Sequence, residues 1–469
     1  MLLHLLQCLH GTLRASINIH GAVAVVLLLV LVLAVVVWTG RTSKTRRELK
    51  HLRKLGLSTS NMADQYHTQF DVPECVETNA PLRIKALYIH PIKSCGPIEV
   101  DRALLTKTGF LYDRCFAFAA EIDEKGADAR SGWRLICQRT KPRMSQLKTE
   151  LWLPGKDSNP RDPLVRAGGC VVVTFRDPDS PGWIDRLDTF LHTWSACTTP
   201  QLSFIVPLQH TPAQMQEFNI TPRDFAIHSR SARGLDMSNI PSVAAVLPKL
   251  KRFLGIPERQ SITLLKCTPD TLTRTNRNLA PLEYIGSPAV HGYTDQQPIN
   301  INSLSSVHAV SALLPPENQP LNALRFRANI WITGAPAYVE ETWKRYRILP
   351  KSLSTEPRAN VAPTLSVVCR TARCTMPNVN LETATFDADI PPPDKKKGRP
   401  QPSATLVEHR TVEDGNKMAL GYLGMHCVPE DWSLKEAEEQ EAGLYVQVGD
   451  EIEVLERGTH LFGATGNDY

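Results

Sequence analysis

Two cysteines five positions apart are the first candidates for chemistry: Cys369 and Cys374 in the segment CRTARCTMPNVN. A structural zinc site needs two such pairs, or a pair followed by closely spaced histidines, and neither accompanies this one. A plant-type iron–sulfur loop has another cysteine three positions further on, where this chain has Pro377. The pair therefore supplies one metal-ligating thiolate or none, and a lone cysteine is by default a small buried core residue.

Cations and hydrogen-bond donors recur near the ends of predicted strands. IHPIKSCG places Lys93 and Ser94 in a turn after a strand, and GFLYDRCFAF places Arg114 at the start of another. LRFRANIWITG carries Arg327 and Asn329 two positions apart, so in a strand both side chains would point to one face. Such groups bind phosphate or oxyanions through charge-assisted hydrogen bonds.

Hydroxyl and amide side chains also precede a predicted helix. The segment NINSLSS contains Asn302, Ser303, Ser305 and Ser306, and the N–H groups at a helix N-terminus favour anions. Together these residues supply cations, hydrogen-bond donors and a soft thiolate. The set does not include the histidines and carboxylates that a hydrolytic metal centre uses. This set suits an anionic, phosphate-bearing cofactor that carries a soft-ligand metal.

Length, charge and cysteine content limit the class of protein. A chain of 469 residues is long enough for two or three domains. Its net charge of +5 is modest and partly confined to one cluster, so no nucleic-acid partner is expected. The 11 cysteines are scattered and odd in number, which favours reduced thiols facing the cytosol over a disulfide framework.

The N-terminus contains an apolar run. Residues 21–38 carry no charge and are about as long as a membrane-spanning helix. Basic residues crowd positions 41–53 just after it, which places the C-terminal body in the cytosol by the positive-inside rule. We therefore expect a single-pass anchor over 1–40, with its transmembrane helix at about 19–39, although a secretory signal remains an alternative. A charged tether over 41–80 would follow.

The remainder predicts a strand-rich α+β fold, closer to barrels than to a doubly wound sheet. Strands are expected at 83–92 and 170–175, helices at 182–194 and 240–255, a buried strand running into a helix at 298–314, and a hairpin at 443–457. PPPDKKKGRPQPS, at 391–403, is a low-complexity segment. We interpret this segment as an exposed insertion, at about 390–404, between two parts of the chain that otherwise look continuous.

These motifs, in this order, resemble the MOSC family. The most similar branch is the membrane-anchored one typified by the mitochondrial amidoxime-reducing component. The resemblance begins at LYIHPIKSCG and TGFLYDRCFAF, continues through YTDQQPININSLSSVHAV, LRFRANIWITGAPAYVEETW and CRTARCTMPNVNLET, and ends at VQVGDEIEVL. It implies a MOSC N-terminal β-barrel domain over 81–215 and a MOSC domain over 216–460.

The resemblance also implies a molybdenum cofactor, Mo-molybdopterin. The family's arginine–cysteine step corresponds to Arg373-Cys374, which makes Cys374 the catalytic cysteine and molybdenum ligand and Cys369 a bystander. Of the two serines near the family's cofactor-binding serine, Ser303 is preferred over Ser306 because it is nearer the strand end. The implied cofactor-binding set is Lys93, Ser94, Arg114, Ser303, Ser306, Arg327, Asn329 and Arg373. One departure affects the substrate side, because Asn380-Leu381-Glu382 replaces the family's Asp-Pro-x.

The activity implied is reduction of N-hydroxylated compounds such as amidoximes and hydroxylamines. The chain has no haem, flavin or iron–sulfur motif, so electrons are expected from a b-type cytochrome and its NADH-dependent flavin reductase. The expected location is the mitochondrial outer membrane, or else the endoplasmic reticulum. The alternative is a sulfur carrier like the MOSC part of molybdenum cofactor sulfurases, whose upstream pyridoxal-phosphate domain is far longer than the roughly 80 residues before Pro81. A non-enzymatic membrane scaffold is a third possibility.

Overall fold

A computed structural model describes ten parts of the chain: 21–34, 47–73, 81–122, 132–179, 182, 199–228, 230–275, 280–351, 358–413 and 420–460. Its largest sheet has eight strands, and an additional pairing between β17 and β2 closes most of it into a barrel. Its strands, in spatial order, are β17 (Ile330–Thr333), β16 (Ile299–Ser303), β20 (Gly421–Pro429), β19 (Thr364–Arg373), β18 (Trp343–Leu349), β22 (Glu451–Arg457), β2 (Arg83–Ile89) and β3 (Ile98–Val100).

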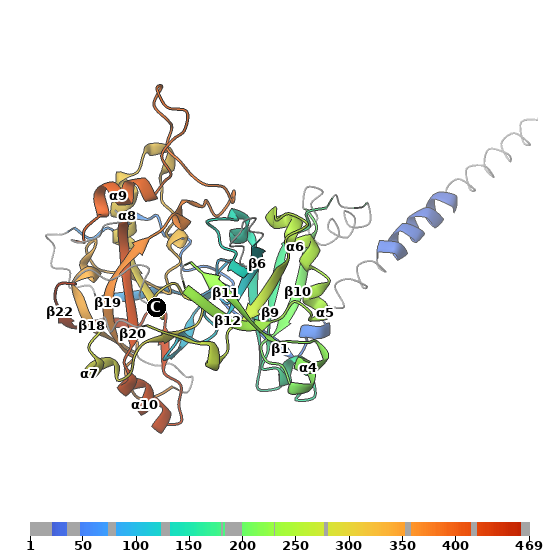
Figure 1. Cartoon of the computed structure of the whole chain (residues 1–469), viewed down its shortest axis with the longest axis horizontal. Coiled ribbons are helices and arrows are strands. Elements are labelled where there is room, and N and C mark those ends of the chain that lie inside the picture. The colour runs from blue at the N-terminus through green and yellow to red at the C-terminus, as the bar shows by residue number, and fades with distance from the viewer. Residues whose placement is uncertain are drawn as a thin grey trace, which may run out of the picture.

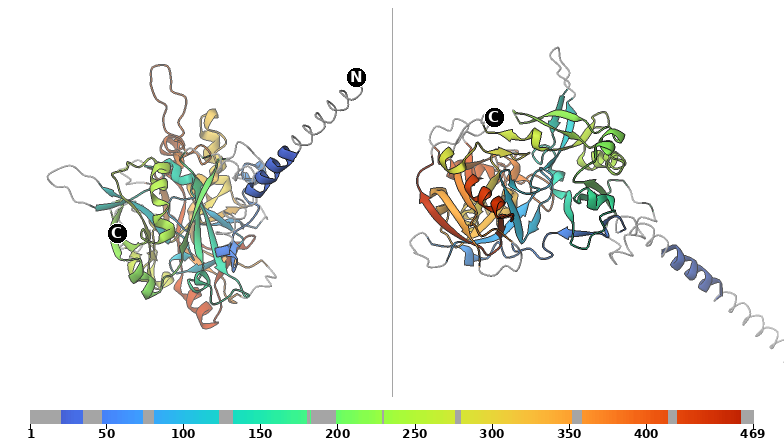
Figure 2. Two further views of the ribbon diagram at one scale, coloured as in Figure 1. Left: turned by 90° about the vertical axis from the view of Figure 1, so that its right-hand side faces the viewer. Right: turned by 90° about the horizontal axis from the view of Figure 1, so that it is seen from below.

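A second, smaller barrel lies beside the first, as Figures 1 and 2 show in green and cyan next to orange and red. It is closed by β11 (Pro222–Ile227), β12 (Arg230–Asp236), β13 (Ile262–Lys266), β6 (Phe116–Ile122) and β7 (Gly132–Leu135). Two barrels in a strand-rich chain agree with the predicted architecture. The predicted domain limits stay predictions, although this barrel takes strands from both sides of residue 215.

Three smaller sheets complete the β-structure of the described ranges. They comprise β1 (Leu52–Leu55), β8 (Lys148–Pro154), β9 (Cys170–Arg176) and β10 (Gln201–Pro207); β21 (Tyr445–Gln447), β4 (Arg102–Thr106) and β5 (Gly109–Phe110); and β14 (Thr273–Arg274) with β15 (Val290–His291).

Helices are short and lie mainly at the barrel rims. Besides the helical residues 21–34, the α-helices of the described ranges are α2 (Pro163–Arg166), α4 (Pro212–Glu217), α5 (Pro241–Ala244), α6 (Leu247–Leu254), α7 (Leu282–Ile285), α8 (Leu304–Leu313), α9 (Ser403–Arg410) and α10 (Asp431–Glu439). The 3-10 turns are η1 (Thr68–Phe70), η2 (Pro142–Gln146), η3 (Pro269–Thr271), η4 (Pro316–Asn318), η5 (Ala323–Phe326), η6 (Val339–Thr342) and η7 (Met376–Asn378).

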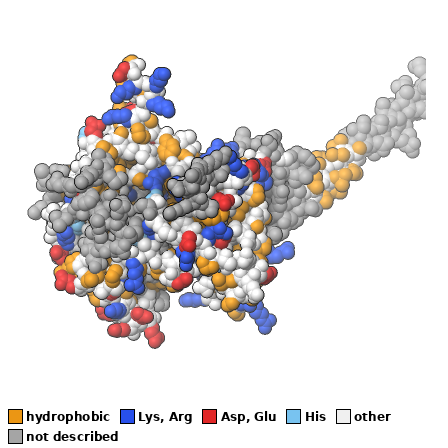
Figure 3. All heavy atoms as spheres, in the orientation of Figure 1, with side chains coloured by type: hydrophobic (Ala, Val, Ile, Leu, Met, Phe, Trp, Pro, Cys, Tyr) orange, Lys and Arg blue, Asp and Glu red, His pale blue; other side chains and the backbone are white. Residues whose placement is uncertain are grey.

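The predicted membrane anchor is contradicted. Within the described ranges, no helix combines the length and the apolar character needed to cross a bilayer. Residues 21–34 are helical, and their apolar side chains are exposed (Figure 3); the rest of the predicted span lies outside the described residues. The prediction of one transmembrane helix is therefore wrong, and with it the prediction of a single-pass protein of the mitochondrial outer membrane or endoplasmic reticulum.

The described part of the segment predicted as a tether, residues 47–73, packs on the body. Strand β1 pairs with β8, and the side chains of Leu49, Leu52 and Met62 are buried. Gln65 accepts a hydrogen bond from the backbone N–H of Ala323 at 2.8 Å. These apolar contacts were not predicted because charged and polar residues dominate the composition of the segment.

Several predicted elements are confirmed by their local pattern. Strands β2 and β9 and the β16–α8 unit lie where predicted. The helix predicted over 240–255 forms as α5 and α6, with a proline in the first turn of α6 that lacks an N–H and suits a helix start. Gly255 ends it in the left-handed region, at φ 63°, as glycine does after helices. The helix predicted over 182–194 falls almost entirely outside the described residues.

The predicted hairpin over 443–457 does not form. Both strands and the intervening Gly449 turn, with φ 87°, are present. However, β21 pairs with β4, whereas β22 pairs with β18 and β2. The turn therefore carries the chain from one sheet to another.

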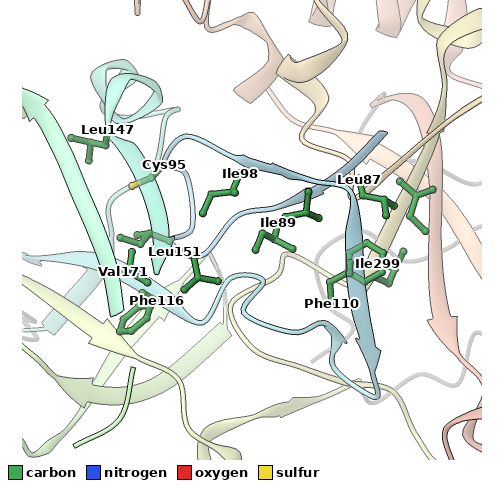
Figure 4. Packing of buried hydrophobic residues seen from close by; sticks show 14 of the residues in the cluster. Leu87, Ile89, Cys95, Ile98, Phe110, Phe116, Leu147, Leu151, Val171 and Ile299 are labelled. Atoms are coloured by element: carbon green, nitrogen blue, oxygen red, sulfur yellow. The ribbon is translucent and has the colours of Figure 1, made fainter. Parts of the chain in front are cut away.

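The main apolar core runs continuously from one barrel to the other. Figure 4 shows Ile89 and Leu87 of β2 packed near Ile299 on one side, while Cys95 and Phe116 extend the cluster towards Leu151 and Val171. This shared core fixes the segment between β2 and β6, where Lys93, Ser94 and Arg114 lie, against both barrels.

Candidate active site

The turn after β2 places one cation and one hydroxyl in the interior. The backbone N–H of Lys93 donates to Phe116 O at 2.8 Å, which fixes the turn to β6. Lys93 Nζ donates to Asp295 Oδ1 at 2.6 Å. Burial lowers the pKa of Lys93, and the Asp295 carboxylate opposes that shift. Ser94 has φ 67°, and its buried Oγ has no hydrogen-bond partner among the described residues.

A buried carboxylate orients the second cation. Arg114 Nη1 donates to Asp113 Oδ2 at 2.6 Å, and Arg114 Nη2 donates to Arg327 O at 2.9 Å. Asp113 Oδ1 accepts from the backbone N–H of His90 at 2.7 Å. Burial alone would raise the pKa of Asp113, but Arg114 and His90 lower it to about 2. Asp113 is therefore ionised and fixes the guanidinium.

Arg327 is a third cation, but not a strand residue as predicted. It follows η5 in the left-handed region, with φ 54°, a conformation that a strand cannot contain. Nη1 donates to Cys95 O at 2.8 Å, while buried Nη2 has no partner among the described residues. Burial, followed by the charge of Arg114, lowers the pKa of Arg327 to about 10.

Asn329 has a different environment from Arg327, so the predicted common face is wrong. Its Nδ2 donates to Tyr88 O at 3.2 Å, and its Oδ1 accepts from the backbone N–H of Asn300 at 3.1 Å. Asn329 thus joins β2 to β16 at the entrance to β17. The amide stabilises the scaffold below the cations.

Arg373 and Cys374 lie at the end of β19. Arg373 Nε donates to Leu423 O at 2.7 Å, Nη1 to Phe326 O at 2.9 Å and Nη2 to Asn300 Oδ1 at 3.2 Å. Burial lowers the pKa of Arg373 to about 9. These contacts orient the strand end and leave Cys374 partly exposed.

The two cysteines of the opening motif have opposite environments. Cys369 is completely buried in an apolar cluster that includes Val368 and Val428. Cys374, by contrast, is partly exposed. Burial raises the pKa of Cys374, and the positive charge of Arg139 acts in the opposite direction.

Arg139, His228 and Asp295 complete the site and were not identified from the sequence. Arg139 Nη2 lies 2.8 Å from His228 Nε2, and His228 Nε2 lies 3.2 Å from Asp295 Oδ1. Asp295 also accepts from Lys93, so it connects the turn after β2 to the β11–β12 turn. Asp295 lies within the motif YTDQQPININSLSSVHAV, but nothing in the spacing of Arg139, His228 and Asp295 indicates a shared site.

The two predicted serines are buried in a separate polar group. Ser303 Oγ lies 2.7 Å from Ser305 Oγ. Ser306 Oγ donates to Glu340 Oε1 at 2.7 Å, and burial raises the pKa of Glu340 to about 7. Among the described residues, neither serine forms a hydrogen bond with Lys93, Arg114 or Arg327, so the cofactor-binding role of the two serines stays a prediction.

The site fits a phosphate-bearing group on two observations. The charge of Arg114 lowers the pKa of both Lys93 and Arg327, so these three cations, which come from separate segments, share one buried region. Their described acidic partners are Asp113 and Asp295. Buried donors normally have partners, yet Ser94 Oγ and Arg327 Nη2 have none among the described residues. Unpartnered donors beside cations match an anionic ligand.

Comparison with protein-family models defines the class of protein. A MOSC N-terminal beta barrel domain matches residues 81–163, and a MOSC domain matches residues 288–453. The chain therefore belongs to the MOSC family, as its sequence motifs indicated. MOSC proteins are generally enzymes associated with the molybdenum cofactor or sulfur carriers. No curated protein matches the chain.

Proposed function

We propose that this MOSC protein is a molybdenum-cofactor oxidoreductase that reduces N-hydroxylated compounds, including amidoximes and hydroxylamines. The family assignment supports an association with the molybdenum cofactor. The observation that carries the proposal is the pair of buried, unpartnered donors, Ser94 Oγ and Arg327 Nη2, beside Lys93 and Arg114.

The residues of the chain divide into three roles. Lys93, Arg114 and Arg327 neutralise and orient the phosphate-bearing end of the cofactor, and Ser94 Oγ donates to it. Cys374 supplies the thiolate ligand of the metal, because it is partly exposed whereas Cys369 is buried. Asp113, Asn329 and Arg373 position these groups through the hydrogen bonds described above.

When bound, the cofactor supplies the two-electron chemistry that protein side chains lack. The overall reaction consumes two electrons and two protons, breaks the N–O bond and releases the amine or amidine with one water molecule. The electrons come from a separate b-type cytochrome, which an NADH-dependent flavin reductase reduces. Arg139 contacts the His228 ring, which also contacts Asp295, and the charges of Arg139 and Asp295 both act on the Cys374 thiol.

The test is to produce the full chain in cells that synthesise the cofactor. We expect about one molybdenum and one pterin per chain, and amidoxime reduction with dithionite as the electron source. A sulfur carrier would instead release transferable sulfur from Cys374 without reducing amidoximes. A purified, folded chain that contains neither metal nor pterin would contradict the proposal.

A further inference from the structure

A basic projection, which we call the finger and define as residues 388–400, extends above α9 in Figure 1. Its two arms meet in a bridge between Ala388 and Pro400. The backbone N–H of Asp389 donates to Arg399 O at 3.0 Å, and Arg399 Nε donates to the Asp389 carboxylate at 3.0 Å. Arg399 also contacts Glu408 at 3.0 Å. The base of the finger is therefore held in a defined position.

The finger is built directly on the turn that follows Cys374. Val379 and Phe386 form a bridge, and the backbone N–H of Asp387 donates to Asn378 O at 2.8 Å. The backbone N–H of Gln401 donates to Asp387 O at 3.0 Å. The chain thus passes from the candidate metal ligand to the finger through a hydrogen-bonded segment.

The tip carries positive charge that is not neutralised by described neighbours. The side chains of Lys395, Lys396 and Lys397 are exposed and form no ion pair with a described residue. Asp394 is the one acidic residue beside them, so the net charge of these four residues is three minus one, or +2. By contrast, Arg399 at the base is paired twice. Figure 3 shows Lys and Arg side chains, in blue, gathered on the projection at the top of the molecule. Ile390 lies nearby in the finger and is 73% exposed, so an apolar side chain is available to a partner.

We propose that the finger is the docking element for an electron-donor protein with an acidic surface around its redox centre. This inference rests on the proposed reductase function. Unpaired charges on a projecting element act over long range and accelerate encounter with an oppositely charged surface. Redox encounters use small, transient interfaces, which the three lysines and Ile390 can provide. A small substrate would gain no contacts from a tip that projects into solvent.

The test compares two electron sources for the same enzyme. In the finger variant, Lys395, Lys396 and Lys397 are all replaced by alanine in the full chain. Reduction of an amidoxime is measured with a soluble, acidic b-type cytochrome and, separately, with dithionite. Because steering raises association rates about 10–1,000-fold, we expect kcat/KM for the cytochrome to fall about tenfold at low ionic strength. The difference should disappear at about 0.5 M salt, where charges are screened within a few ångströms.

A distributed variant provides the control. Lys50, Lys156 and Lys435 are exposed, lie outside the finger and have no described ion pair; replacing them with alanine changes the net charge equally. This control should keep the cytochrome rate, and both variants should keep the dithionite rate. Titrating each chain with oxidised cytochrome measures the binding affinity without turnover. We expect weaker binding only in the finger variant. Equal losses in both variants, or an unchanged cytochrome rate in the finger variant, would overturn the inference. Absence of dithionite-driven activity in the wild-type chain would instead count against the proposed function.

Discussion

Replacing Asp113 with asparagine should destabilise the cofactor-free chain by about 2–4 kcal/mol at pH 7. Asparagine has nearly the same shape and can still accept from the His90 backbone N–H. However, it removes the negative charge that Arg114 contacts at 2.6 Å. The side chain of Asp113 is only 1% exposed, so solvent does not replace the lost interaction. Removing one partner from a buried charged pair generally costs a few kcal/mol.

The pKa of Asp113 gives a second estimate and a sign for the pH dependence. The value falls from 3.8 to about 2 in the folded chain, and each unit corresponds to about 1.4 kcal/mol, so the whole shift amounts to about 2–3 kcal/mol. Because the folded pKa is depressed, this stabilisation is fully present above about pH 4 and is lost as the pH falls through about 2. The difference between wild type and Asp113→Asn should therefore shrink on acidification.

Urea unfolding of both chains between pH 7 and pH 3 measures this difference. The matched control is Asp224→Asn, which removes an ion pair with Arg233 that two hydrogen bonds join and whose members are 61% and 58% exposed. Losing that exposed pair should cost much less than losing the buried one, because solvent screens it. If Asp113→Asn costs no more than Asp224→Asn, or if its cost does not decrease at low pH, the argument for a buried ionised carboxylate fails.

Two further predictions concern the cations and the N-terminal segment. Replacing Lys93, Arg114 or Arg327 singly with alanine should weaken cofactor binding about 10–100-fold, because each change removes a charge-assisted hydrogen bond of roughly 1.5–3 kcal/mol. Equilibrium dialysis measures the affinity of each variant for the cofactor. A chain that lacks residues 1–46 should unfold at the wild-type temperature, whereas one that lacks 1–70 should unfold several degrees lower, because β1 and its buried neighbours are lost. Calorimetry distinguishes the two truncations, and equal unfolding temperatures would show that the β1 segment does not contribute.

The sequence predicted those elements whose signal is local. The buried residues of β16 continue into α8 without a break in burial, and β9 is an apolar run bounded by turns, so both were visible in the pattern. Arg327 was misplaced because its spacing from Asn329 looks like a strand, while the backbone there leaves the β-region at φ 54°. A single left-handed residue leaves no trace in hydrophobic periodicity.

The site was predictable only as a set of residue types. Lys93 and Arg114 were identified because they border predicted strands. Their carboxylate partners differ in how far away they lie in the sequence. Asp113 is adjacent to Arg114 in the sequence, whereas Asp295 is 202 positions from Lys93. Pairing of that kind depends on how the two barrels pack, which no local pattern encodes. The same reason explains why the predicted 443–457 hairpin failed, since β21 and β22 find distant partners.

The most direct test of the central claim compares two single cysteine variants of the cofactor-loaded chain. Cys374→Ser should abolish amidoxime reduction with dithionite, because a serine hydroxyl is a harder and far less acidic ligand than a thiol, while part of the pterin remains bound through the cations. Cys369→Ser should keep most of the activity, since Cys369 is buried in an apolar cluster. Equal loss in both variants, or full activity in Cys374→Ser, would contradict the assignment of Cys374 as the metal ligand.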